Sequence, residues 1–257
     1  MIVQHDVVVS SVDEIAEGIF LLRVRSPQLA ESSAPGQFVN VRLGDGRSGP
    51  LLRRPFSICR VEGDFVELLL NIVGQGTRLL AQKRVGEFLD VLGPLGKPFG
   101  FRGDFDTAII VAGGMGMAPF PFLTDSLQRE EKQIATFLGA RTRNQIAMMN
   151  LKNVKLATDD GSSGHHGTVV SLLEQYLATH SPQKPKIFGC GPTSMMKALA
   201  ELSFRVGIEC ELSLEGDMGC GIGICQGCPV ELVNGEKKYA LVCTQGPTFL
   251  ADQIILS

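Results

Sequence analysis

Residues 219–228 of this chain read GCGIGICQGC, and one further cysteine follows at Cys243. The spacing is C-x4-C-x2-C, with fourteen residues before the last cysteine, which is the plant-type pattern of thiolates that hold a [2Fe–2S] cluster. Three ligands in so short a loop must turn inward towards two irons, and the interleaved glycines permit that backbone and leave amides free to donate to sulfur. The predicted cluster ligands are Cys220, Cys225, Cys228 and Cys243.

Structural zinc is the alternative occupant of these thiols. Zinc sites usually pair two C-x2-C-like knuckles, whereas Cys243 stands alone after a long gap. In that case the protein is a zinc-binding interaction module without flavin. Cys59 and Cys210 lie in apolar strand contexts and are interpreted as core residues.

The composition of the 257 residues is that of an ordinary globular protein, with 44% hydrophobic and 20% charged residues. This length predicts two compact domains and a small appendage. A net charge of −3 gives no electrostatic case for nucleic acid. Residues 1–11 lack a signal-peptide pattern and no apolar run reaches membrane-spanning length, so we expect a cytoplasmic protein that does not contact a membrane. Seven cysteines, an odd number in a reducing compartment, argue against a disulfide framework.

Residues 1–102 are rich in short alternating apolar runs separated by turn residues, which predicts an antiparallel barrel or sandwich. The expected strands are Val7–Val9, Ile19–Val24, Phe38–Leu43, Phe56–Val61 and Phe65–Ile72. One short helix is expected at Thr77–Lys83, and Gly93–Pro98 is interpreted as a turn-rich exit.

From residue 103 to 213 strands alternate with helices, which predicts a doubly wound parallel sheet. The expected strands are Thr107–Ala112, Ile134–Leu138, Val154–Ala157, Lys186–Phe188 and Ile208–Ser213. The expected helices are Pro119–Arg129, Val169–Ala178 and Thr193–Phe204. Residues 214–257 form a third, small unit, in which a hairpin of Val230–Val233 and Lys238–Val242 flanks the turn signal Asn234-Gly235.

Two motifs of the first unit suit a phosphate. Residues 53–58 read RRPFSI at the entrance of an expected strand, and an arginine fork offers bidentate donors and a fixed charge to a pyrophosphate. About twenty residues later the turn Gly74–Thr77, GQGT, opens the expected helix, as phosphate-binding turns do. Either motif alone also suits a purely structural role.

A nucleotide motif follows the first strand of the second unit. Residues 111–119 read VAGGMGMAP, where glycines let the backbone approach a phosphate at a helix N-terminus. The motif is incomplete, because Pro119 occupies the last glycine position of G-x-G-x-x-G. The turn Cys190-Gly191-Pro192 ends a later strand, where open parallel sheets gather ligands, although a packed thiol remains an alternative for Cys190.

The choice between NAD and NADP stays open on the residues alone. The second strand is followed by Arg141 and Arg143 rather than by the acidic residue that would bind the ribose hydroxyls of NAD. These arginines suit either a 2′-phosphate or an exposed surface. His165 and His166 are interpreted as a solvated loop pair, since no ligand spacing accompanies them.

The segments RPFS, GQGT, AGGMGMAPF and GCGPTSMM and the cysteine loop occur in an order that closely resembles the electron transfer subunits of class B dihydroorotate dehydrogenase, within the ferredoxin-reductase superfamily. The resemblance covers the whole chain. It implies an α/β plus all-β fold with an antiparallel flavin-binding barrel (1–102), a doubly wound parallel-sheet NAD-binding domain (103–213) and a [2Fe–2S] module (214–257).

The resemblance also implies cofactor contacts by matching position. FAD would contact Arg54, Pro55, Phe56, Ser57, Leu69, Leu70, Asn71, Gly76 and Thr77. The nicotinamide nucleotide would contact Gly113, Gly114, Gly116, Cys190, Gly191 and Pro192. Asn71 departs from the family pattern, in which an arginine often stands at this position and contacts a phosphate.

The implied function is a relay in pyrimidine biosynthesis. Electrons from the FMN of a separate catalytic subunit, which oxidises dihydroorotate to orotate, would pass through [2Fe–2S] and FAD to NAD+, in an assembly of two copies of each chain. No catalytic residue is assigned, because the cofactors carry the chemistry. The same motifs also resemble the electron transfer subunits of sulfide dehydrogenase and ferredoxin:NADP oxidoreductase, which are the alternative functions among flavin-dependent electron transfer subunits.

Overall fold

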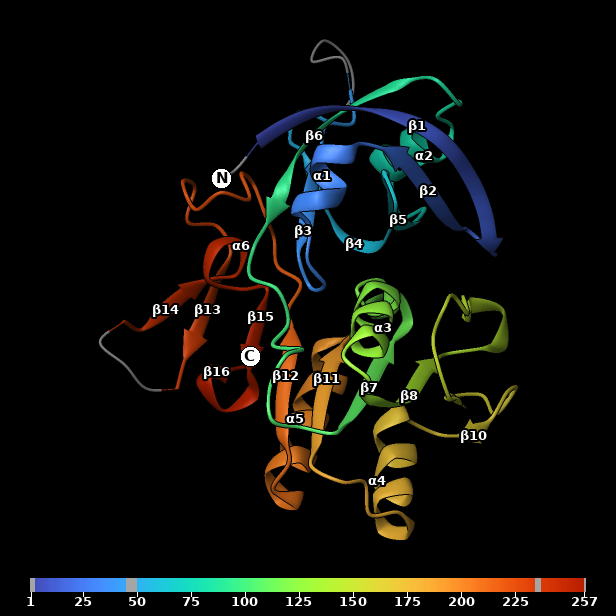
Figure 1. Cartoon of the computed structure of the whole chain (residues 1–257), viewed down its shortest axis with the longest axis vertical. Coiled ribbons are helices and arrows are strands. Elements are labelled where there is room, and N and C mark those ends of the chain that lie inside the picture. The colour runs from blue at the N-terminus through green and yellow to red at the C-terminus, as the bar shows by residue number, and fades with distance from the viewer. Residues whose placement is uncertain (1–2, 45–49, 234–236, 257) are drawn as a thin grey trace.

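The computed structural model describes residues 3–44, 50–233 and 237–256. The first unit is a closed barrel of six antiparallel strands in the order β1-β2-β5-β4-β3-β6 (Figure 1). The strands are β1 (Val3–Ala16), β2 (Ile19–Arg25), β3 (Phe38–Val41), β4 (Arg54–Glu62), β5 (Phe65–Asn71) and β6 (Phe88–Leu95). Alternate side chains fill the interior, as in Val7, Val9, Leu22, Val24, Val39 and Val41, which are at most 1% exposed. The predicted antiparallel barrel is confirmed.

Two barrel elements differ from the sequence expectation. Gly93–Pro98 was expected to be a turn-rich exit, but its first three residues belong to β6, whose Gly93 pairs with Val3 and whose Leu95 pairs with Phe38. A six-stranded barrel closes only if this segment bridges β1 and β3, so the non-local pairing outweighs the local Gly-Pro signal. The strand β1 is also far longer than the expected Val7–Val9, because it pairs with both β2 and β6.

Two short helices add apolar side chains to the core of the barrel. The helix α1 (Pro27–Ser32) was not expected, although Ser26 before Pro27 is a normal helix start, and its hydroxyl accepts from the Leu29 amide at 3.4 Å. The helix α2 (Gln75–Ala81) replaces the expected Thr77–Lys83 and begins directly after Gly74.

The second unit is a seven-stranded sheet in the order β10-β9-β8-β7-β11-β12-β15. Its strands are β7 (Thr107–Gly113), β8 (Gln133–Ala140), β9 (Val154–Thr158), β10 (His165–His166), β11 (Pro185–Cys190), β12 (Glu209–Ser213) and β15 (Thr248–Leu250). The five strands predicted for this sheet are parallel, and β15 alone runs antiparallel, against β12. The chain therefore supplies the edge of its nucleotide-type sheet from its C-terminal segment, which the sequence did not indicate. The interpretation of His165 and His166 as a loop pair is wrong, because they form the short strand β10, which pairs in parallel with β9.

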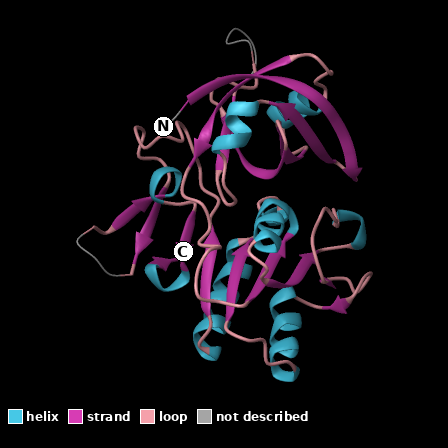
Figure 2. Cartoon of the chain, in the orientation of Figure 1, coloured by secondary structure: helices cyan, strands magenta, loops and turns pink. Residues whose placement is uncertain are grey.

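The helices cover the two faces of this sheet. The helix α3 (Phe120–Arg129) lies between the sheet and the barrel, and α4 (Val169–Thr179) and α5 (Thr193–Val206) lie on the other side (Figures 1 and 2). Buried apolar side chains of α3 join the core that contains Ile110 and Ala112 of β7, while those of α4 and α5 join the core that contains Ile109 and Val111. No helix among the described residues is long and apolar enough to span a bilayer.

The C-terminal unit is a three-stranded sheet beside a loop. Strand β13 (Pro229–Leu232) pairs with β14 (Tyr239–Leu241) and with β16 (Ile254–Ile255). The predicted antiparallel pairing of the hairpin is present, and its predicted turn at Asn234-Gly235 lies outside the described residues. Cys243 lies in the short helix α6 (Val242–Gln245) that follows β14.

A buried ion pair fixes the segment that leaves the barrel. Lys186 Nζ on β11 lies 3.2 Å from Glu211 Oε2 on β12 and donates to the Gly100 carbonyl at 3.0 Å. Both carboxylate oxygens of Glu211 accept from the Gly100 amide, at 3.1 and 3.0 Å. The side chains of Lys186 and Glu211 are only 11% and 9% exposed, so each charge is stabilised by the other in place of water.

Replacing Glu211 by leucine should therefore lower the free energy of unfolding by about 2–3 kcal/mol, less than the usual cost of breaking a buried pair because Lys186 keeps Glu209 at 2.8 Å. Urea denaturation followed by circular dichroism measures this loss. Glu209→Gln is the matched control, since Glu209 is 57% exposed, and it should cost less than about 1 kcal/mol. Equal losses in the two variants would show that burial does not decide the effect.

Candidate functional site

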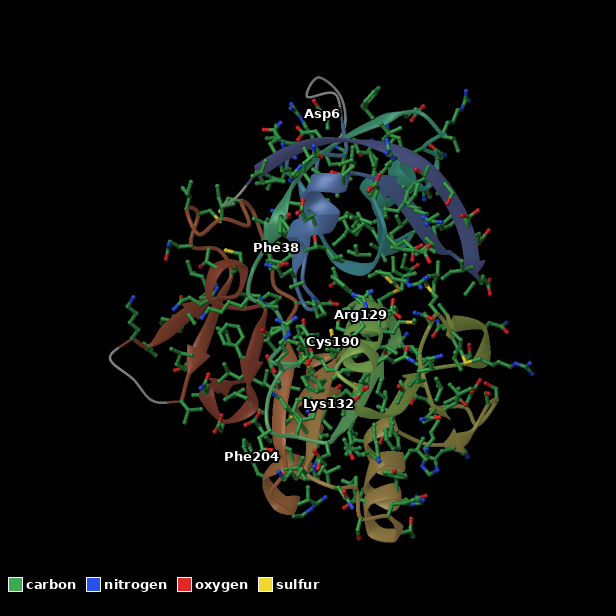
Figure 3. The ribbon with its side chains drawn as sticks, in the orientation of Figure 1. Asp6, Phe38, Arg129, Lys132, Cys190 and Phe204 are labelled. Atoms are coloured by element: carbon green, nitrogen blue, oxygen red, sulfur yellow. The ribbon has the colours of Figure 1, made fainter. Side chains whose placement is uncertain are left out.

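A cleft of about 660 Å³ is lined by residues from all three units. The barrel contributes the start of β4, the end of β5 and the turn before α2, and the sheet contributes Met115, Ala118 and Cys190. The segment that leads to the cysteine loop contributes residues 213–216 and Met218. Figure 3 shows Phe38 and Cys190, two of the lining residues, on the facing sides of barrel and sheet. The cleft exists only because the three units meet here.

All nine positions expected to contact FAD line this cleft. They are Arg54, Pro55, Phe56, Ser57, Leu69, Leu70, Asn71, Gly76 and Thr77. They come together because β4 and β5 are antiparallel neighbours, so the start of one lies beside the end of the other. The turn into α2 is stabilised by Thr77, whose Oγ1 accepts from the amides of Val73 at 3.0 Å and Gly74 at 3.3 Å.

The two arginines of the RRPFS segment have different environments. The Arg53 guanidinium is held by Asp90, with Nη2 2.7 Å from Oδ2, and by the Asp90 carbonyl at 3.0 Å. The exposed Arg54 donates, among the residues that the structure describes, only to the carbonyls of Leu52 and Arg53, and it lines the cleft. Arg54 is therefore the arginine of this pair whose charge remains available to a phosphate.

The expected nicotinamide residues gather at the carboxyl edge of the parallel sheet. Strands β7 and β11 are neighbours, with Ala112 beside Cys190, and the strand order reverses between them. Such a switch point is where open α/β sheets bind their ligands. The loops that follow the two strands touch backbone to backbone, because a Cβ on Gly116 would lie 2.4 Å from the Cys190 carbonyl oxygen.

Of these expected nicotinamide residues, Cys190 alone lines the cleft itself. Gly113, Gly114, Gly116, Gly191 and Pro192 are not among its lining residues; Gly191 has a left-handed φ of +157° and packs on Gly113. The structure thus brings the six residues to one place but gives only the thiol direct access to the flavin side.

Ser213 and Glu215 are lining residues that the sequence analysis missed. Burial raises the pKa of the Cys190 thiol, the nearby Glu215 carboxylate raises it further, and a hydrogen bond with Ser213 opposes this shift. Burial also raises the pKa of Glu215 itself. The thiol therefore stays protonated and uncharged at neutral pH. The only sequence signal for these two residues was their position between the last parallel strand and the first cluster cysteine.

Residues near the end of β8 form a separate exposed group. Arg141 and Arg143 are exposed, and the Arg143 amide donates to Ser162 Oγ at 2.9 Å. His165 lies on β10 and shares a hydrogen bond with Ser171 Oγ at 3.0 Å. His166, the other histidine of the predicted loop pair, is exposed.

The four loop cysteines lie as two neighbouring pairs. The Cys225 amide donates to Cys220 Sγ at 3.3 Å, and the Cys243 amide donates to Cys228 Sγ at 3.5 Å. Cys228 and Cys243 are buried, whereas Cys225 is exposed. In the part of the chain that the structure describes, no three His, Cys, Asp or Glu side chains surround one point as a single metal ion needs. Two pairs of thiols fit a cluster of two irons, each with two cysteine ligands.

Backbone amides give the first pair its electrostatic character. Burial opposes ionisation of Cys220, but hydrogen bonds from the amides of Cys225 and Ile222 outweigh it and lower the pKa of Cys220 to about 6. In the second pair, burial and then the adjacent Cys228 raise the pKa of Cys243 to about 12. An anionic cluster held here would therefore gain two amide hydrogen bonds at Cys220 and one at Cys228, with exclusion of water on the side of the buried Cys228 and Cys243.

Comparison with known proteins agrees with this geometry. Residues 215–255 match the model of the iron–sulfur cluster binding domain of dihydroorotate dehydrogenase B. Over 258 residues, spanning 97% of both chains, the protein is 34% identical to the dihydroorotate dehydrogenase B (NAD(+)) electron transfer subunit of Desulforamulus reducens. It is 35% identical over the full length of both chains to the subunit of the same name from Geobacillus sp. strain WCH70.

The chain belongs to the family of dihydroorotate dehydrogenase B electron transfer subunits. The family resemblance predicted from the motifs is confirmed, and neither the zinc module nor the sulfide dehydrogenase and ferredoxin:NADP oxidoreductase alternatives are favoured.

Solved structures confirm the predicted fold class. A chain of the NADH-dependent reduced ferredoxin–NADP oxidoreductase superposes with a TM-score of 0.86 at 26% identity, covering 97% of this chain and 90% of its own. The cytochrome b5 reductase domain of Ulva prolifera nitrate reductase, at 17% identity and a TM-score of 0.66, covers 80% of this chain and 94% of its own and shares the fold.

Substituting serine for Cys225 should abolish the iron–sulfur absorbance of the protein. The flavin spectrum should stay unchanged, because Cys225 is not among the residues that line the cleft. Iron analysis and the visible spectrum of the purified protein measure both. Cys210→Ser is the matched control, since Cys210 is buried in the core of the sheet and should keep full iron content. Iron retained at the wild-type level in Cys225→Ser would contradict the ligand assignment.

Proposed function

We propose that this electron transfer subunit joins an FMN-containing catalytic subunit, which oxidises dihydroorotate to orotate, to NAD+ in pyrimidine biosynthesis. FAD occupies the cleft, and Cys220, Cys225, Cys228 and Cys243 hold the [2Fe–2S] cluster. One observation carries the proposal. The cleft is lined at once by the flavin-type barrel, by the end of β11 and by the segment that runs to the first cluster ligand. FAD in the cleft would therefore lie next to both the nicotinamide site and the cluster, the two groups with which it exchanges electrons.

The residues of the cleft bind and orient the cofactor. Arg54 pairs with the pyrophosphate, Ser57 donates from the same strand, and the N-terminal turn of α2 at Gly76 and Thr77 provides further donors. Leu69 and Leu70 of β5 present an apolar wall. FAD, when bound, supplies both the hydride exchange with the nicotinamide and the one-electron exchange with the cluster.

The nicotinamide enters at the switch point of the sheet. The loop of Gly113, Gly114 and Gly116 approaches its phosphates, and Cys190-Gly191-Pro192 lies beside its ring. The protonated Cys190 thiol adds no charge next to the ring and excludes water from it. NAD is the nucleotide, in keeping with the NAD(+) that the relatives' names carry.

The assembly consists of two copies of this chain and two catalytic subunits. It is cytoplasmic and contacts neither membrane nor nucleic acid, consistent with the net charge of −3. Within the chain, residues 1–102 act as the FAD domain, 103–213 as the NAD domain and 214–257 as the cluster module.

Replacing Arg54 by alanine should reduce the FAD content of the purified protein by tenfold or more, about 1.4 kcal/mol of lost pyrophosphate pairing, with the cluster retained. The ratio of flavin to iron absorbance measures the effect. Arg102→Ala is the control, because Arg102 is 76% exposed and pairs only with Glu130 away from the cleft. Unchanged flavin content in Arg54→Ala would contradict its role.

Mixing the chain with an FMN-containing catalytic subunit that oxidises dihydroorotate should give a complex that forms orotate and NADH from dihydroorotate and NAD+. Absorbance at the NADH band follows the reaction, and the Cys225→Ser variant is the control that should lose it while keeping FAD. A complex that forms orotate equally well without the cluster would overturn the relay.

A further inference from the structure

A buried asparagine of the barrel contacts the first cluster ligand. Asn40 lies on β3 and is 1% exposed, and its Nδ2 donates to the Cys220 carbonyl at 3.1 Å, across 180 residues of sequence. Its Oδ1 has no hydrogen-bond partner among the residues that the structure describes. Burying an amide costs free energy unless it makes a hydrogen bond, so the bond from Asn40 to Cys220 is a specific contact between loop and barrel rather than incidental packing.

The cysteine loop is shaped to lie directly on this asparagine. Gly221, next to Cys220, has a left-handed φ of +73°, and a Cβ there would lie 2.0 Å from Asn40 Nδ2. A side chain at this position would push the loop away from the barrel. Gly221 is therefore required both by its backbone conformation and by the close approach of Asn40.

The barrel side of the contact is rigid and belongs to the flavin motif. Asn40 pairs with Pro55 of β4 on one side and Leu92 of β6 on the other. Its carbonyl accepts from Arg53 at 3.4 Å, and Arg53 is itself held by Asp90. One residue thus lies beside the strand that starts the flavin segment and bonds directly to a cluster ligand.

We propose that Asn40 is a positioning residue that seats the cluster loop on the flavin barrel and thereby sets the spacing across which electrons pass between FAD and the cluster. The inference rests on the proposed function. Asn40 does not touch the cleft, so it acts on the cluster through Cys220 and not on FAD directly.

The test is rapid reduction of the holoprotein by NADH, the reverse direction of the relay. NADH delivers two electrons to FAD as a hydride, and one of these then reduces the cluster. In Asn40→Ala, flavin content and the rate of flavin bleaching should equal those of the wild type, while cluster reduction should slow severalfold. The electron paramagnetic resonance signal of the reduced cluster should also shift.

Asn153→Asp is the matched control. It removes the same kind of bond, from Asn153 Nδ2 just before β9 to the Ile134 carbonyl of β8 at 2.8 Å, in the second unit rather than the barrel, and should change neither step. In a second pair of variants, Gly221→Ala should lose cluster content, and the double variant Asn40→Ala/Gly221→Ala should recover part of it, because the added methyl then has room.

Unchanged cluster reduction and an unchanged resonance signal in Asn40→Ala would overturn the positioning role of Asn40. Equal slowing of flavin bleaching and of cluster reduction would also overturn it, because it would indicate a general loss of structure. Failure of the wild-type cluster to accept electrons from NADH would instead overturn the proposed function. The two failures are therefore distinguishable.

Discussion

The relative placement of the three units depends on residues 246–248, where the C-terminal segment contacts barrel and sheet together. The Gly246 carbonyl accepts from the Lys97 amide, and Thr248 Oγ1 donates to the Pro98 carbonyl at 3.0 Å, at the exit of the barrel. The Pro247 carbonyl accepts from the Leu214 amide at 2.9 Å, and Thr248 pairs with Ser213 at the sheet edge. Backbone bonds to both neighbours leave little freedom for one unit to move against the others. This short segment therefore holds the three units in the positions that shape the cleft between them.

A protein whose cofactors carry the chemistry contributes mainly distance and environment. Cys190 illustrates the environment, because burial and the charge of Glu215 keep its thiol neutral beside the expected nicotinamide. The packing of Gly116 on the Cys190 backbone illustrates the distance, since even a methyl group would separate the two loops. Asn40 extends the same logic to the cluster. In each case a small or neutral group, rather than an acid or base, is what the site requires.

The sequence predicted the local features of this chain better than the non-local ones. The barrel and the parallel order of the sheet follow from contiguous apolar runs and the turn residues between them. The nine cleft residues follow from the resemblance of segments such as RPFS to a known family, matched position by position. The strand β6 at Gly93–Leu95 and the edge strand β15 are fixed by partners far along the chain, so their own residues carry no signal. Glu215 and Asn40 were missed for the same reason, because neither belongs to a motif and each gains its role from a contact across units.

The two cysteine pairs differ in burial, so the two sides of a cluster held by them would have different surroundings. Cys225 is exposed, and Ile224 beside it is 77% exposed, whereas Cys228 and Cys243 are buried against β13 and α6. Hydrogen bonds and exposure set the potential of an iron–sulfur centre. Each pair accepts an amide hydrogen bond, at Cys220 Sγ and at Cys228 Sγ, whereas the exposed cysteine, Cys225, belongs to the first pair. The same Cys220 is the ligand that Asn40 holds from the barrel. The first pair therefore meets solvent through Cys225 and the barrel through Cys220, whereas Cys228 and Cys243 of the second pair are buried. In the proposed relay, a cluster held by these four thiols would be least buried on the Cys220–Cys225 side, and this is the side that a docking catalytic subunit would reach.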